Sequence, residues 1–85
     1  MTTYRIEAKT NLSYGELSYA KRTKNYNLVR KMASVLCCAF EEVVITNDDT
    51  GELYMNHYVS HEYELPQLTC AEALAEVEEL WYDNN

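Results

Sequence analysis

Three segments of the chain have a pattern of apolar and polar residues that predicts a β-strand. In residues 3–9, Tyr4, Ile6 and Ala8 fall on one face of a strand, and the charged residues between them fall on the other. Residues 43–47 and 52–59 predict two more strands, joined by the Asn- and Asp-rich turn 47–51. We expect the last two strands to form a β-hairpin that pairs antiparallel with the strand at 3–9.

The returning strand of this hairpin carries different side chains on its two faces. Gly51 precedes it and suits a turn, because glycine adopts a positive φ readily. Pro66 marks the limit beyond which the strand cannot extend. Period-two alternation places Leu53, Met55, His57 and Val59 on one face, and Tyr54, Asn56 and Tyr58 on the other.

Helical periodicity predicts two or three helices. Ser13 and Glu16 have the spacing of a capping box, which predicts a short helix from residue 14 to about residue 23. Residues 26–40 carry apolar residues at helical spacing, with Asn25 or Asn27 as the N-cap. Whether residues 13–40 form one helix or two stays open.

A last helix is expected over residues 70–82, where Thr69 and Glu72 form another capping-box pattern. The order of elements predicts an α+β fold. We expect a two-layer sandwich in which a three-stranded antiparallel sheet is covered by helices on one face. The expected core between the layers comprises Val29, Met32, Leu36, Phe40, Leu74, Val77 and Trp81.

The length of 85 residues predicts one domain, spanning residues 1–85. The net charge of -7 is distributed unevenly along this domain. All seven Lys and Arg residues lie in residues 1–31, whereas every Asp and Glu except Glu7 and Glu16 lies in residues 32–85. Such asymmetry is typical of a charged partner or of pairing between the two halves, and it also serves solubility.

Several classes of function are disfavoured by what the sequence lacks. No apolar run is long enough to span a membrane, and residues 1–11 lack the apolar stretch of a secretory signal, so we expect a cytoplasmic protein without a membrane partner. There is no glycine-rich phosphate loop and no recognisable catalytic motif, so we expect neither an enzyme nor a cofactor. The net negative charge also disfavours direct binding of nucleic acid.

Cysteine and histidine residues do not predict a metal site. Cys37, Cys38 and Cys70 lack zinc-ligand spacing and lie among apolar residues, so we expect reduced thiols in the core. His57 and His61 are four residues apart on a predicted strand, about 13 Å from each other, which is too far for one ion.

The candidate binding residues are mainly carboxylates. On a helical wheel the last helix places four of them on the side opposite its apolar face: Glu72, Glu76, Glu79 and Asp83. We call these four the acidic stripe. It is interpreted as a solvated face, as a set of partners for the basic N-terminal half, or as a docking surface for a basic protein.

Two further groups are candidates for a partner-binding surface. Asp48, Asp49 and Glu52 make the hairpin turn acidic, although they lack the ligand pattern of a calcium loop. The chain also has eight tyrosines, and Tyr is favoured at protein interfaces because it buries a large area at little entropic cost. We therefore include Tyr54 and Tyr58, on the hairpin, among the candidate contact residues.

In size, acidity and lack of catalytic residues the chain resembles the small acidic proteins that phages encode against host defences, such as anti-CRISPR and DNA-mimic anti-restriction proteins. The resemblance is one of general character and covers no aligned segment. It implies a non-enzymatic inhibitor that occupies a basic nucleic-acid-binding surface of a larger protein, such as a CRISPR effector. The alternative is a small cytosolic adaptor, whose acidic stripe pairs with the basic segment 21–31 of a second copy in a homodimer.

Overall fold

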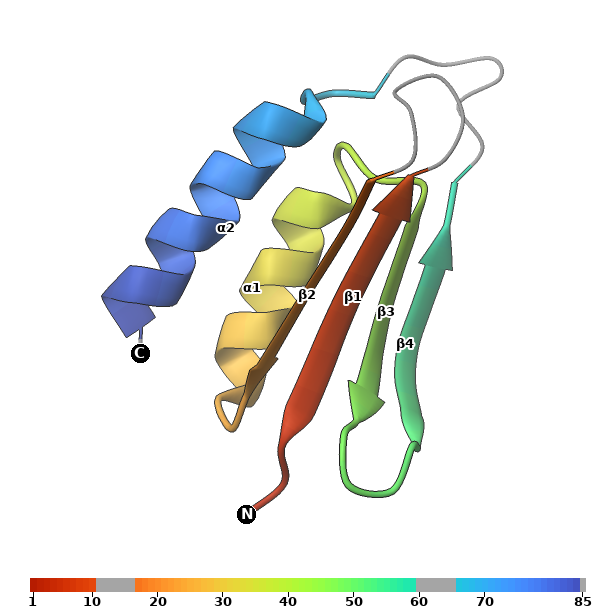
Figure 1. Cartoon of the computed structure of the whole chain (residues 1–85), viewed down its shortest axis with the longest axis vertical. Coiled ribbons are helices and arrows are strands. Elements are labelled where there is room, and N and C mark those ends of the chain that lie inside the picture. The colour runs from red at the N-terminus through yellow and green to blue at the C-terminus, as the bar shows by residue number, and fades with distance from the viewer. Residues whose placement is uncertain (11–16, 60–65, 85) are drawn as a thin grey trace.

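The computed structural model describes residues 1–10, 17–59 and 66–84, and it has an α+β fold (Figure 1). Four strands form one antiparallel sheet in the order β2-β1-β3-β4. The first helix, α1, packs against one face of this sheet, and α2 packs beside α1. In chain order the elements are β1 (Tyr4–Thr10), β2 (Leu17–Thr23), α1 (Tyr26–Leu36), β3 (Glu42–Asn47), β4 (Leu53–Tyr58) and α2 (Cys70–Asn84).

The expected short helix at 14–23 is wrong, because residues 17–23 form the edge strand β2. This strand pairs with β1 along its whole length, from Thr10 opposite Leu17 to Tyr4 opposite Thr23. Tyr19 packs against the core, whereas the neighbouring residue on the other face, Ser18, is exposed. Pairing with β1 satisfies the backbone of this alternating segment and outweighs its weak helical signal. The capping-box residues that suggested a helix lie outside the described residues.

The predicted hairpin and its pairing with the first strand are confirmed. β3 pairs antiparallel with β1 on one side and with β4 on the other. The turn is held by the Asn47 side chain, whose Oδ1 accepts hydrogen bonds from the backbone N–H of Asp49 (2.8 Å) and Thr50 (3.2 Å). Gly51 has a φ of 78°, the left-handed conformation that glycine adopts without steric cost.

A β-bulge in β4 changes which face Tyr54 occupies. Ile45 pairs with Met55, but the next residue, Thr46, pairs with Leu53, so Tyr54 is an additional residue in the ladder. The expected sharing of one face by Tyr54 and Tyr58 is therefore wrong. Tyr54 packs with Tyr4 and Tyr26, whose ring centroids lie 5.5 and 6.3 Å away, and belongs to the α1 side of the sheet.

Helix α1 begins where predicted but ends earlier. Its N-cap is Asn25, whose side chain accepts a hydrogen bond from the N–H of Leu28 at 3.1 Å. The helix was expected to continue to residue 40. Instead, the N–H groups of Cys38 and Ala39 donate to carbonyls three residues earlier, those of Val35 and Leu36, so the regular i to i−4 bonding of the helix ends. Phe40 is still buried, so its assignment to the core is confirmed.

The core lies between α1 and the two central strands. The apolar residues of α1 pack against the inward residues of β1 and β3, and Ala73 and Val77 of α2 close one side. Leu74 and Trp81 were expected in the core but are only partly buried, because α2 lies at the margin, beside α1. Within the described part of the chain, neither helix is long and apolar enough to cross a membrane. The fully buried core residues with large side chains are Ile6, Leu28, Val29, Met32, Leu36, Phe40, Val43, Ile45 and Val77.

Replacing Leu36 with Ala should test this core. Leu36 is fully buried, so we expect the substitution to lower the free energy of unfolding by about 2–5 kcal/mol. Lys31→Ala, on the exposed side of the same helix, should change it by no more than about 0.5 kcal/mol. Urea unfolding followed by circular dichroism measures both. Equal stability of the two variants would contradict the assigned face of α1.

Candidate protein-binding surface

The acidic stripe lies on α2, whose start is fixed by the predicted capping box. The backbone N–H of Glu72 donates to Thr69 Oγ1 at 3.1 Å, and the backbone N–H of Thr69 donates to Glu72 Oε1 at 3.0 Å. The hydrogen bond that the Glu72 carboxylate accepts from the Thr69 backbone N–H, and then one from the Thr69 side chain, holds the pKa of Glu72 below its ordinary value of 4.5. Glu72 is therefore committed to capping the helix, which distinguishes it from the other three carboxylates of the stripe.

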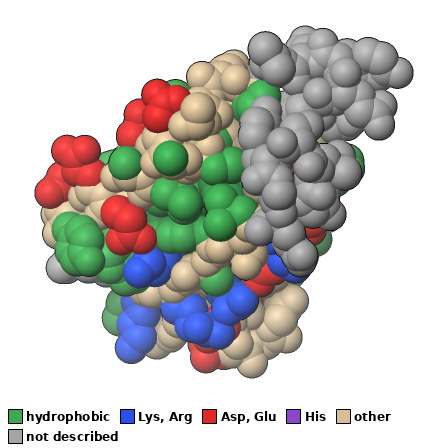
Figure 2. All heavy atoms as spheres, turned by 45° about the horizontal axis from the view of Figure 1, so that its top comes forward, with side chains coloured by type: hydrophobic (Ala, Val, Ile, Leu, Met, Phe, Trp, Pro, Cys, Tyr) green, Lys and Arg blue, Asp and Glu red, His purple; other side chains and the backbone are tan. Residues whose placement is uncertain are grey.

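The rest of the acidic stripe is exposed and unpaired. Glu76, Glu79 and Asp83 are exposed, and none of them makes an ion pair in the described structure. Figure 2 shows acidic side chains on one side of the molecule and a group of Lys and Arg side chains on another part of the same view. In the described structure these three carboxylates therefore do not pair with the basic N-terminal half, which was one of the interpretations of the stripe.

Four of the seven cations do have partners within the chain. Arg5 and Lys9 both contact Glu7, their neighbour on β1, at 2.7 and 2.8 Å. The hydrogen bond from Lys9, and then that from Arg5, lowers the pKa of Glu7. Lys21 and Arg22 of β2 reach carboxylates of the acidic half, at Glu78 (3.8 Å) and Asp48 (3.1 Å).

The other three cations form what we call the basic surface: Lys24, Arg30 and Lys31. Lys24 lies just before the N-cap of α1, and Arg30 and Lys31 lie in its middle. All three are exposed, and no ion pair with any described residue is present. Among the described residues, unpaired charges of opposite sign thus lie on α2 and on or just before α1.

The Lys21 side chain of β2 contacts helix α2 at two points. The ammonium of Lys21 lies 5.2 Å from the ring centroid of Trp81, in addition to its contact with Glu78. The hydroxyl of Tyr19 is buried beside this contact, and burial, with the nearby Glu78 charge, raises its pKa. These contacts orient α2 so that Glu78 faces the sheet while the stripe faces outward.

The acidic turn and the two hairpin tyrosines do not join the stripe in one surface. Asp48 is held by Arg22, and Asp49 Oδ2 accepts a hydrogen bond from the backbone N–H of Thr3 at 3.4 Å. The turn lies at the end of the sheet where α1 begins, and α2 lies on the other side of α1 in this view (Figure 1). Tyr58 is 67% exposed, and it lies on the sheet face opposite Tyr54. Glu52 is exposed in the same turn as Asp48.

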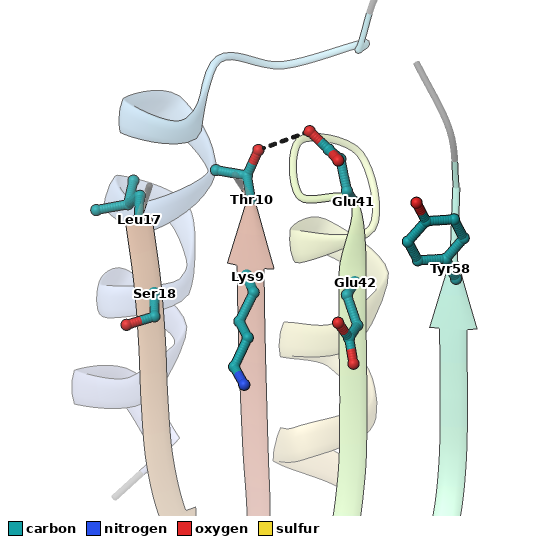
Figure 3. A pocket seen from close by; sticks show the side chains of 7 residues that line it. All are labelled: Lys9, Thr10, Leu17, Ser18, Glu41, Glu42 and Tyr58. Carbon is teal, nitrogen blue, oxygen red and sulfur yellow. Dashed lines mark hydrogen bonds between the residues drawn. The ribbon is translucent and has the colours of Figure 1, made fainter. Parts of the chain in front are cut away.

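A hollow of about 230 Å³ lies at the end of the sheet where β1 ends and β3 begins (Figure 3). Glu41, which is buried, accepts a hydrogen bond from Thr10 Oγ1 at 2.9 Å. Lys9, Ser18, Glu42 and Tyr58 line the hollow from neighbouring strands, as does Leu17. Sequence reasoning missed this group, because nothing in the pattern around Glu41 distinguishes a buried carboxylate from an exposed one.

The cysteines show no sign of chemical activation. All three are free and half-buried, and burial is the main cause that raises the pKa of Cys37 and of Cys70. A raised pKa keeps the thiol protonated and weakly nucleophilic. No group of three or more His, Cys, Asp or Glu residues suited to a metal ion occurs in the part of the chain that is described. His57 is half-buried in β4, and His61 lies outside the described residues.

Comparison with known proteins adds no relative. A scan against protein-family models, a search of curated proteins and a search of solved structures each returned no match.

The capping box yields a direct test. Replacing Thr69 with Ala removes the hydroxyl that accepts the Glu72 N–H, so we expect the free energy of unfolding to fall by about 1 kcal/mol. Thr69→Ser keeps a hydroxyl and should retain most of the stability. Urea unfolding of the two variants and the parent measures this difference. Equal losses in both variants would contradict the capping role.

The pH dependence of the same contact follows from the lowered pKa of Glu72. Because the folded protein favours the ionised carboxylate, the stabilisation is complete above the ordinary value of 4.5 and is lost as the pH falls through the lower folded value. An NMR titration of the Glu72 side chain should give a midpoint below 4.5. A midpoint at or above that value would rule out the observed cap in solution.

Proposed function

We propose that this chain is a non-enzymatic protein-binding module, whose α2 docks through the acidic stripe onto a basic surface of a larger protein. The observation that supports this proposal is that most of the stripe is exposed and unpaired among the described residues. Glu76, Glu79 and Asp83 are exposed on one face of a helix and have no cationic partner in the described structure.

The geometry of the stripe suits a surface that binds regularly spaced anions. From Glu72 to Asp83 the helix rises about 16 Å, and its carboxylates recur at intervals of three or four residues. A helix holds these charges in fixed positions, so little conformational freedom is lost on binding. Lys and Arg side chains that bind phosphate also accept carboxylate in charge-assisted hydrogen bonds.

The class of partner is proposed from the general resemblance to phage-encoded anti-defence proteins. In this proposal the stripe takes the place of nucleic-acid phosphates on a defence effector, such as a CRISPR effector, and blocks that surface in a one-to-one complex. The partner would then be a basic protein rather than nucleic acid. The net charge of -7 supports a basic protein as the partner, since it attracts a basic surface and repels a phosphate backbone.

The alternative, a self-complementary adaptor, is favoured by the basic surface. In that arrangement the stripe of one copy contacts Lys24, Arg30 and Lys31 of the next. The contact would involve fewer cations than the whole basic segment 21–31, because Lys21 and Arg22 already bind Glu78 and Asp48. In a homodimer with two-fold symmetry this contact forms twice, with the basic surface of each copy against the stripe of the other.

Charge reversal of the free carboxylates tests the docking proposal. In the variant E76K/E79K/D83K we expect partner binding to be lost while the fold survives, because these side chains are exposed and make no ion pair with any described residue. Glu72 is left unchanged because it caps the helix. The control D49K/E52K reverses two carboxylates in the hairpin turn and should retain binding.

The measurement is affinity capture from the native host followed by calorimetry with the captured protein. Binding of the unaltered chain should weaken as the Debye length shrinks from about 10 Å at 0.1 M salt to about 3 Å at 1 M. Nucleic acid should compete for the same partner. If E76K/E79K/D83K binds as tightly as the parent, the docking proposal is wrong. Loss of self-association in that variant, without competition by nucleic acid, would favour the adaptor.

A further inference from the structure

Strand β4 is an edge of the described sheet, and it carries no Lys, Arg, Asp or Glu. Its sequence from Leu53 to Tyr58 contains no proline either. Charged residues and proline on an edge are the usual devices that prevent a second strand from pairing with it. Both Leu53 and Tyr58 are more than half exposed, which leaves apolar surface beside this edge.

The backbone of β4 has hydrogen-bonding groups that point away from the sheet. The N–H of Val59 donates to the carbonyl of Glu41, so Val59 belongs to the residues whose backbone faces β3. In an antiparallel ladder this direction alternates, so His57 and Met55 also face β3. The N–H and C=O groups of Asn56 and Tyr58 consequently face outward, along the free edge.

The other edge of the sheet differs. β2 carries Lys21 and Arg22, and two antiparallel copies of it would bring like charges together. The contacts of Lys21 with Glu78 and with the Trp81 ring also place α2 beside this strand. Of the two described edges, β4 is therefore the one that lacks protection.

We propose that β4 pairs antiparallel with β4 of a second copy, so that two sheets join into one across a two-fold axis. In the register that we propose, His57 lies opposite His57 of the other copy, and Asn56 lies opposite Tyr58. The outward backbone groups of these two residues then exchange hydrogen bonds. The bulge at Tyr54 breaks the alternation on one side and limits the pairing to this short segment.

Charge explains why a second copy fits this edge. Each copy has a net charge of -7, so two copies repel one another, and a strand without charged side chains is where they approach at least cost. The side chains of Asn56 and Tyr58 each donate and accept hydrogen bonds, so an antiparallel pair is complementary to itself. The pairing uses neither the acidic stripe nor the basic surface, so it is independent of the function proposed above.

Sedimentation velocity at increasing protein concentration tests the pairing. We expect the apparent mass to rise toward twice 9.9 kDa, and to rise further when salt increases from about 0.1 M to about 1 M, because screening weakens the repulsion between the copies. The adaptor contact between the stripe and the basic surface would respond in the opposite direction. A monomer at every concentration, or a dimer that salt dissociates, would overturn the proposal.

Two variants at Asn56 separate edge pairing from other contacts. Asn56→Pro removes an N–H that points away from β3, so the fold should remain while the dimer is lost. Asn56→Thr keeps this N–H and should still dimerise. Circular dichroism confirms that each variant is folded. A dimer that persists in a folded Asn56→Pro variant would overturn the proposal.

A cross-link tests the register without the use of proline. In the proposed pairing the two residues 57 are a non-hydrogen-bonded pair, with Cα atoms about 4.5 Å apart, which is within reach of a disulfide. His57→Cys should therefore give a covalent dimer under mild oxidation. Asn56→Cys, about 7–8 Å from its counterpart, should cross-link much less. Equal cross-linking of both variants and the parent would overturn the register.

Discussion

The structure depends on the burial of one helix face. Val29, Met32 and Leu36 of α1 are fully buried against residues that β1 and β3 direct toward them, such as Ile6 and Ile45. In a chain of 85 residues this contact has to supply most of the apolar burial that offsets conformational entropy. It also fixes where everything else lies: α2 is held mainly by α1, and the edge strands β2 and β4 flank the pair of strands that α1 covers.

Because α2 is attached to α1 at the margin of the core, most of its surface remains outside. Ala73 and Val77 are its only described buried residues, and Lys21 of β2 contacts both Glu78 and Trp81 of α2. A helix in this position contributes less to the core than α1 does, but it presents a long face to solvent. That face carries the acidic stripe, whose position thus follows from the packing of α1.

Much of the sheet was predictable because its signals are local. The alternation in β1 and the Asn- and Gly-containing turn predicted the hairpin and its pairing with β1, and Thr69 with Glu72 predicted the start of α2. The strand β2 was not predictable in the same way. Its alternation is weak, and only its partner β1 decides between strand and helix, which is information distant in the sequence.

The candidate site was likewise predictable only where its signals are local. Helical periodicity alone placed the acidic stripe on one exposed face of α2, but it could not reveal that Glu72 caps the helix while Glu78, outside the stripe, binds Lys21. Likewise, alternation predicted a shared face for Tyr54 and Tyr58, and a bulge of one residue separated them. Single-residue irregularities of a ladder depend on tertiary contacts, here the packing of Tyr54 against Tyr4 and Tyr26.

The charges on the two helices are not arranged for stability. α1 has no acidic residue in its first turn, and α2 has no basic residue in its last turn, where Asp83 lies instead. An anion near a helix C-terminus is unfavourable, by about 0.3–1 kcal/mol in exposed settings, and like charges spaced four residues apart add a few tenths more. The described structure relieves neither cost with an intramolecular partner for Glu79 or Asp83. A cationic surface placed against α2 would relieve both costs together, which is the physical basis of the docking that we propose.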